Sequence, residues 1–262
     1  MRALYRHDAW PPAVGGLIVW AWLTLALWEQ SPYGRYLDHG EWLEVGFAAD
    51  ICRTLPAGSV VFPALLYVTG WVLMTVAMML PTTVPLLAMF ARMTAGRTDR
   101  GLLLTLVIVG YLAIWTTFGV LAHAADMGLH AIVARDAFLS FNGWIISVLV
   151  LAIAGLFQFS RFKYHCLDKC RAPFSFINEH WRGSAERRQS FLLGVHHGLF
   201  CVGCCWAIML LMFLMGSGSV GWMLAIGAVM AIEKNVAWGK RLSAPLGLGL
   251  VLASTAVLAL NI

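Results

Sequence analysis

Long uninterrupted apolar runs are the feature of this sequence that most limits its fold. Hydrophobic residues fill 60% of the 262 positions and charged residues only 12%, far from the composition of soluble domains. A helix needs ~20 mostly apolar residues to cross a hydrocarbon core of about 30 Å. Backbone polar groups find no water in lipid, so such runs form helices or a closed barrel, and unbroken rather than alternating hydrophobicity favours helices. The sequence therefore predicts an all-α integral membrane protein.

We predict a polytopic transmembrane helix bundle of about seven spans. The second run is longer than one crossing, and the sixth is cut short by two charged residues. Nothing indicates a second soluble domain, a linker or a repeat array, so residues 1–262 are expected to form one integral membrane domain. The predicted helices are Pro12–Trp28, Val60–Phe90, Leu102–Ala122, Ala137–Phe159, Phe191–Met215, Gly221–Ile232 and Ser243–Ile262.

The lysines and arginines predict which side of the membrane each loop faces. Of the 18 Lys and Arg residues, 15 lie in one set of loops, and the other set holds the remaining three beside seven acidic residues. Basic loops mark the cytoplasmic side, so we expect a cytoplasmic N-terminus and an external C-terminus. The basic set comprises the N-terminus, 92–100, 160–189 and 233–241, and the other set comprises 29–59 and 123–136.

Two long loops are the main places for polar structure. The outer loop, 29–59, has an apolar middle suited to a short helix along the headgroups, and the inner loop, 160–189, is basic and suited to the lipid surface. Anionic headgroups account for the net charge of +5, so no nucleic-acid partner is expected. The first run lacks a small-residue cleavage site, so it is expected to be an anchor rather than a signal peptide.

A cluster of potential metal ligands lies in the fifth predicted helix, in the stretch HGLFCVGCCW. With His197 at zero, Cys201 falls at about 40°, Cys204 at about −20° and Cys205 at about 80° around the helix. These side chains share one face, and thiolates with an imidazole suit copper, or zinc as the alternative, better than Mg(II) or Ca(II). Close helix packing by small side chains is the competing interpretation.

Four more sulfur residues are candidate ligands near this site. Cys166 and Cys170 would share a face if the fourth helix continued into the inner loop, which would make them an entry site at the cytoplasmic mouth. Solvated loop thiols are the alternative. Met74 and Met78 have the M-x-x-x-M spacing, which resembles that of membrane-spanning copper uptake transporters, although methionines at helical spacing also fill cores.

Prolines and charges mark two further positions. Pro81 and Pro85 each remove a backbone donor, so the second helix is expected to break, with the freed carbonyls bonded by threonines, waters or a cation. Glu233 offers a carboxylate to a metal site or a proton relay, or else is solvated at the helix end. The adjacent Lys234 is expected to snorkel to the membrane interface.

A second polar group lies at the predicted outer end of the third helix. His123, Asp126 and His130 are within reach of one helical face if that helix continues, which indicates either a second metal site or ordinary interfacial polarity. A haem is not expected, because His197 and His123 lie toward opposite leaflets and leave no evident pair of axial ligands.

The cysteine blocks KYHCLDKCRAP and GLFCVGCCW, together with WVLMTVAMMLPTTVPLL and WMLAIGAVMAIEKN, resemble a bacterial family of predicted metal-binding integral membrane proteins. The resemblance extends from about Trp71 to Asn235. It implies a multi-pass protein of the bacterial inner membrane with a metal site, and it implies no particular reaction. On matching positions it points to Cys166, Cys170, His197, Cys201, Cys204, Cys205 and Glu233.

Three functions remain open from the sequence. The first is a metal-handling membrane protein that binds copper at cytoplasmic thiolates, for transport or for delivery to a partner metalloprotein, with binding that strengthens as pH rises because thiols must lose protons. The second is a membrane thiol oxidoreductase, although burial in lipid slows thiolate attack. The third is an accessory subunit of a larger membrane complex. No P-loop is present, so coupling to ATP within the chain is not expected.

Overall fold

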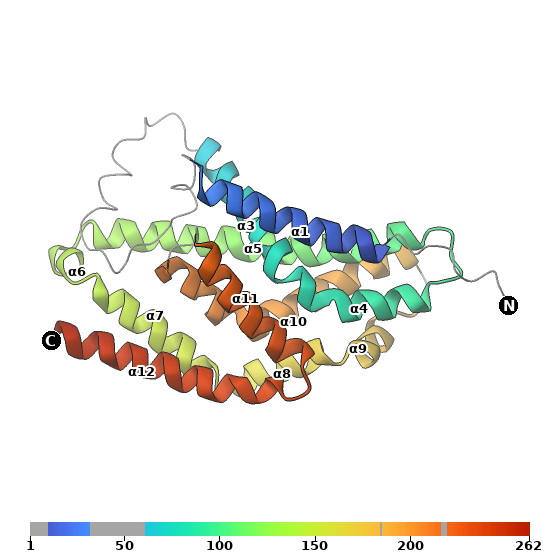
Figure 1. The fold of residues 1–262 in the computed structure, drawn as a ribbon. Coiled ribbons are helices and arrows are strands. Elements are labelled where there is room, and N and C mark those ends of the chain that lie inside the picture. The colour runs from blue at the N-terminus through green and yellow to red at the C-terminus, as the bar shows by residue number, and fades with distance from the viewer. Residues whose placement is uncertain (1–9, 32–60, 184, 216–218) are drawn as a thin grey trace.

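The structure is a computed structural model that describes residues 10–31, 61–183, 185–215 and 219–262, and no strand occurs among them. The predicted short helix of the outer loop, and Cys52, lie outside these residues. The helices form one bundle (Figure 1). They are α1 (Trp10–Glu29), α3 (Val61–Met78), α4 (Leu80–Met93), α5 (Arg100–Val133), α6 (Ala137–Phe141), α7 (Trp144–Phe157), α8 (Arg161–Arg171), α9 (Pro173–His180), α10 (Glu186–Met215), α11 (Val220–Asn235), the short 3-10 helix η2 (Gly239–Leu242) and α12 (Ser243–Asn261).

The helices long and apolar enough to cross a membrane are fewer than predicted. In the described part of the chain they are α1, α5, α10 and the continuous segment Gly239–Asn261. Two bent pairs, α3 with α4 and α7 with α8, bring the number to six if each pair is one span. The sixth predicted run became α11, whose 16 residues fall short of the ~20 needed for a crossing. The prediction of an all-helical fold is confirmed, whereas the number seven is not.

The break in the second predicted helix occurs where the prolines require it. The axes of α3 and α4 differ by 61°, and Pro81 stands at the start of α4, where its ring excludes a continuous helix. The Oγ1 hydroxyls of Thr82 and Thr83 donate to the carbonyl of Met79 at 2.7 and 3.3 Å. The threonines therefore bond a carbonyl at the break, but it is that of Met79 and not those of Ala77 and Pro81, which lie four residues before the two prolines and are the ones they free.

The inner loop is folded rather than extended. The fourth predicted helix does not continue into it, because α7 ends at Phe157 and α8 leaves at an angle of 61°. The Oγ of Ser160 caps the new helix by accepting from the backbone N–H of Lys163 at 3.1 Å, as Ser does at an N-cap. This bend lays α8 across α10, so α8 faces the cysteines of α10.

The central helix, α10, is packed most closely against α5. At Gly194 an added Cβ would overlap the backbone carbonyl of Val107, and at Gly110 it would overlap that of Phe191. Glycine at these two positions lets the two backbones touch. Figure 1 shows α10 running through the bundle, with the start of α1 and the end of α12 at opposite ends.

Loops of the predicted basic set contact one another at one end of the bundle. Arg97, in the turn before α5, forms an ion pair with Glu186 at the start of α10. Lys240 of η2 lies 2.8 Å from Asp168 of α8. The segments 92–100, 160–189 and 233–241 are therefore neighbours, as loops on the same side of a membrane must be.

Candidate metal centre

Three thiols stand on one buried face of α10. Cys201, Cys204 and Cys205 are each about 1% exposed, and all three are free thiols. The Sγ atoms of Cys204 and Cys205 donate to the backbone carbonyl of Cys201, at 3.1 and 2.9 Å. The protons of these two thiols are thus directed at a carbonyl, and the sulfur of Cys201 is left to accept from other groups.

A fourth thiol comes from α8. The thiol of Cys170 is half-buried and lies near the thiols of Cys201 and Cys204. We call Cys170, Cys201, Cys204 and Cys205 the sulfur cluster. Cys166, one turn earlier on α8, is buried, and its Sγ packs against Gly203, where an added Cβ would lie only 2.7 Å away. Both loop cysteines therefore face α10, and only Cys170 joins the sulfur cluster.

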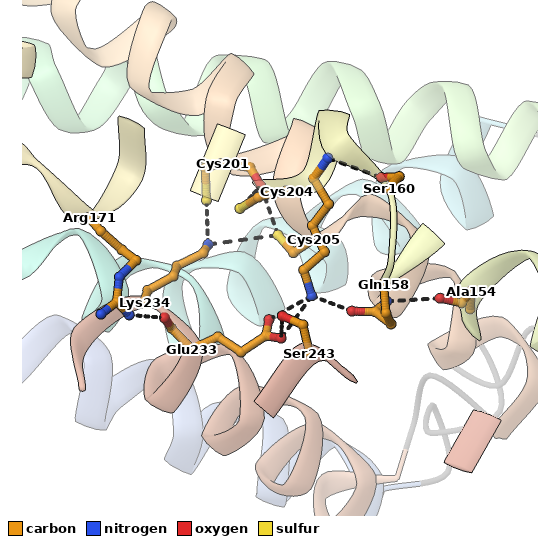
Figure 2. Close-up of polar contacts among 11 residues, drawn as sticks. Ala154, Gln158, Ser160, Arg171, Cys201, Cys204, Cys205, Glu233, Lys234 and Ser243 are labelled. Carbon is orange, nitrogen blue, oxygen red and sulfur yellow. Dashed lines mark hydrogen bonds and ion pairs between the residues drawn. The ribbon is translucent and has the colours of Figure 1, made fainter. Parts of the chain in front are cut away.

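A lysine side chain points into the sulfur cluster. The Nζ of Lys234 lies 2.9 Å from the Sγ of Cys201 and 3.7 Å from that of Cys205 (Figure 2), and 4.0 Å from the Sδ of Met79. The expectation that Lys234 snorkels to the interface is wrong, since the residue is 6% exposed. Its position near the end of α11 directs it inward because α11 packs against α3, α4 and α10.

Two rings complete the surroundings of Cys201. The hydroxyl of Tyr111 lies 3.1 Å from the Sγ of Cys201 and donates to the carbonyl of Met79 at 3.3 Å. The ring of His197 lies against Tyr111, with centroids 5.7 Å apart, and against Phe176. Its Nδ1 is buried and has no hydrogen-bond partner among the described residues. A buried imidazole nitrogen left unpaired one turn from Cys201 is a candidate metal ligand.

The sulfur and nitrogen donors of this region lie close together, but they are not arranged as a complete coordination shell. Among residues that the structure describes, no group of three or more His, Cys, Asp or Glu side chains is arranged to hold an ion. The chemistry of the donors is nevertheless soft, because three buried thiols share one face of α10 with the thiol of Cys170 nearby, and such ligands favour Cu(I) among the common metals. A two-coordinate ion needs only two of these sulfurs.

Glu233 belongs to a different network. Its carboxylate lies 2.8 Å from the Nζ of Lys163 and accepts from the Oγ of Ser243 at 2.6 Å, and Gln158 also accepts from Lys163. Figure 2 shows this network beside Cys201, Cys204 and Cys205, with Glu233 and Lys234 directed to different partners. The expectation of a solvated acid is wrong, since Glu233 is 2% exposed, and Lys163 is its cation.

The two predicted methionines lie in the core of the bundle. Met74 and Met78 are buried on α3, and the side chain of Met78 packs at Gly227 of α11. The thioether that reaches Lys234 belongs to Met79, which stands at the break between α3 and α4. Met79 lies about 100° from Met78 around a continuous helix, so the M-x-x-x-M spacing does not single it out.

The outer polar group is divided between two contacts. The Nδ1 of His130 lies 3.5 Å from the Oδ1 of Asp126, whereas His123 stacks on Tyr67 with ring centroids 3.9 Å apart. Within the described residues these three side chains form no cluster suited to a metal.

Comparison with known families gives the family of this chain. A family model described as PpoB2, copper chaperone, matches residues 68–257, which is most of the chain. The chain belongs to this copper-chaperone family. The matched segment includes every residue of the sulfur cluster, as well as Met79, Tyr111 and Lys234, and the family supports copper rather than zinc. No match is found among curated proteins or among solved structures.

Sequence reasoning did not identify Met79, Tyr111 or Lys163 as residues of this region. It also missed the inward direction of Lys234. One signal was available for the two lysines, because an ionisable side chain at the border of an apolar run is costly unless it is paired. Tyr111 gave no signal, since a tyrosine in an apolar helix is common.

Proposed function

We propose that this protein is a copper-handling integral membrane protein that takes up Cu(I) at the sulfur cluster and passes it to a partner metalloprotein. The observation that carries the proposal is that three buried thiols of α10 lie together with the half-buried thiol of Cys170 from α8. Copper-chaperone membership supports copper as the cargo. Soft sulfur ligands hold Cu(I) more strongly than they hold the hard cations abundant in cells.

The proposed ligands are Cys201 and Cys170, which lie on different helices. Cys204 and Cys205 are alternative partners one turn away on α10, and His197 lies on the same face. A site with more sulfurs than a two-coordinate ion needs allows the ion to exchange between thiolates one step at a time. This property suits a chaperone, because delivery requires the partner's ligands to replace the donor's ligands in turn.

We place the protein in the bacterial inner membrane as a multi-pass domain spanning residues 1–262, with the sulfur cluster toward the cytoplasm. The apolar helices support membrane insertion. The contacts among segments 92–100, 160–189 and 233–241 support a common side for the basic loops, and that side is cytoplasmic by the distribution of positive charge. Cytoplasmic thiols stay reduced, which keeps them available for Cu(I).

The proposal is tested by replacing Cys201 and Cys204 together with serine. Serine oxygen is a hard ligand, so we expect copper in protein purified under reducing conditions to fall from stoichiometric to background, as measured by mass spectrometry of the metal. The matched control is Cys52→Ser, which lies outside the segment matched by the family and should keep its copper. Unchanged copper in the double variant, with normal behaviour on size-exclusion chromatography, would refute the assignment.

A further inference from the structure

The neighbours of the buried ammonium of Lys234 are sulfur atoms. Its polar contacts in the described part of the chain are the sulfurs of Cys201, Cys205 and Met79. The carboxylate nearest in sequence, that of Glu233, is engaged by Lys163. Among the described residues no ion pair joins Lys234 to an acid. A buried charge without an opposite partner is very costly, so the partner of this ammonium must be a thiolate.

Distance and hydrogen bonding together identify Cys201 as that thiolate. Its sulfur lies 2.9 Å from the Nζ of Lys234, against 3.7 Å for the sulfur of Cys205. Cys204 and Cys205 instead donate to a carbonyl, which requires them to keep their protons. The cluster without metal thus combines one negative sulfur with one positive nitrogen, and its net charge is zero.

We propose that Lys234 makes the sulfur cluster selective for monovalent over divalent soft cations. This inference rests on the proposed function and names the residue that sets the charge of its cargo. Cu(I) between two thiolates has a net charge of −1, which the ammonium cancels. A divalent ion between the same two thiolates is neutral, so the ammonium becomes an uncompensated buried charge, which is strongly disfavoured.

A divalent ion escapes this penalty only by recruiting a third thiolate. The geometry opposes that solution, because no three-ligand group is arranged for an ion in the described part of the chain. Two of the remaining thiols are also held by the carbonyl of Cys201. Charge and geometry therefore both disfavour divalent ions. Neither effect depends on how soft the ion is.

Silver(I) and cadmium(II) provide the test, since they are isoelectronic, soft and redox-inert, and differ in charge. Detergent-purified full-length protein is titrated with each ion alone and with both together, and bound metal is measured by mass spectrometry, with affinities from chelator competition. The ratio of the Cd(II) to the Ag(I) dissociation constant should fall about tenfold or more in Lys234→Met, because the repelling charge is gone. Each variant is referred to the wild-type ratio, so the intrinsic affinities of the two ions cancel.

Two further variants separate charge from packing. Lys234→Arg keeps the positive charge and should keep the wild-type ratio. Lys240→Met removes an exposed lysine that pairs with Asp168, and it should also leave the ratio unchanged. If Lys234→Met does not elute as a folded protein, Lys234→Gln removes the same charge with a polar side chain and should show the same fall.

An unchanged ratio in the uncharged variants, an arginine variant that shifts as methionine does, or a wild-type protein that binds neither ion would each overturn the inference. The proposed function fails separately. A protein that prefers Ag(I) to Cd(II) through Lys234 and yet takes up no copper would overturn the copper assignment and leave the charge selection standing. Copper binding with an unchanged ratio would do the reverse.

Discussion

Two consecutive residues near the end of α11 direct their side chains into separate buried networks. Successive helical side chains point about 100° apart, so Glu233 reaches Lys163 and Ser243 while Lys234 reaches the sulfurs of Cys201 and Cys205. The guanidinium of Arg171 also bonds the backbone carbonyls of Glu233 and Val236. The end of α11 is thereby tied to α8, and the ion pair holds the helix that carries Lys234 in place.

Removing the acid of this ion pair should destabilise the protein strongly. Glu233→Gln leaves the ammonium of Lys163 buried at 0% exposure without an anion, so the free energy of unfolding should fall by about 3–5 kcal/mol. The measurement is denaturation in detergent micelles. Glu179→Gln breaks an exposed pair with Lys169 and should have little effect. Equal stability of Glu233→Gln and wild type would show that the pair is not needed.

At the scale of the elements, the site depends on two breaks and one close contact. The break between α3 and α4 turns Met79 toward Lys234, and the bend between α7 and α8 lays Cys170 on α10. The close contact of α5 with α10 at Gly194, where an added Cβ would lie 3.0 Å from the backbone nitrogen of Tyr111, brings Tyr111 to Cys201. The site therefore depends on two bends in the chain and on one unusually close approach of two helices.

The contact between α5 and α10 predicts opposite results for two glycines of the same helix. Gly110→Ala places a methyl group against the backbone of Phe191 on α10, which cannot move aside, so stability should fall by about 1–3 kcal/mol. Gly128→Ala meets no atom within 4 Å and should be neutral or stabilising by up to about 1 kcal/mol. Melting curves in detergent compare the two. Equal behaviour would mean that the helices are not in backbone contact.

For the whole molecule, the distribution of charge matches the arrangement of the bundle. The basic segments are in contact with one another at one end, and the start of α1 lies at the opposite end from the end of α12 (Figure 1). This arrangement agrees with the proposed orientation, in which the N-terminus and the basic loops are cytoplasmic. It would place uptake of copper at the side where thiols stay reduced.

Reporter fusions should locate the two ends. Alkaline phosphatase, which is active only outside the cytoplasm, should be active when fused after Ile262 and inactive when fused after Arg182, because the positive-inside rule holds the second position in the cytoplasm. A cytoplasmic fluorescent reporter at the same two positions should give the reciprocal pattern. Activity at Arg182 with none at Ile262 would reverse the proposed orientation.

The sequence by itself determined the features that depend on neighbours along the chain. The apolar runs predicted helices because a backbone in an apolar setting must bond to itself. The 3.6-residue period placed Cys201, Cys204 and Cys205 on one face, and Pro81 predicted the break in the second helix. These outcomes depend on hydrogen bonds and sterics within a few residues, so local spacing is enough to predict them.

Only the tertiary structure decided which residues meet across helices. It brought Cys170, Tyr111 and Lys234 to Cys201, it brought Met79 to Lys234, and it paired Glu233 with Lys163. Local spacing predicted a break in the second helix, but it contains no information about the 61° angle of that break, about the bend between α7 and α8, or about the depth at which α5 meets α10. These follow from how whole helix surfaces fit together. A charge such as that of Lys234 can be buried only where another helix supplies its partner, so its direction is a property of the folded bundle.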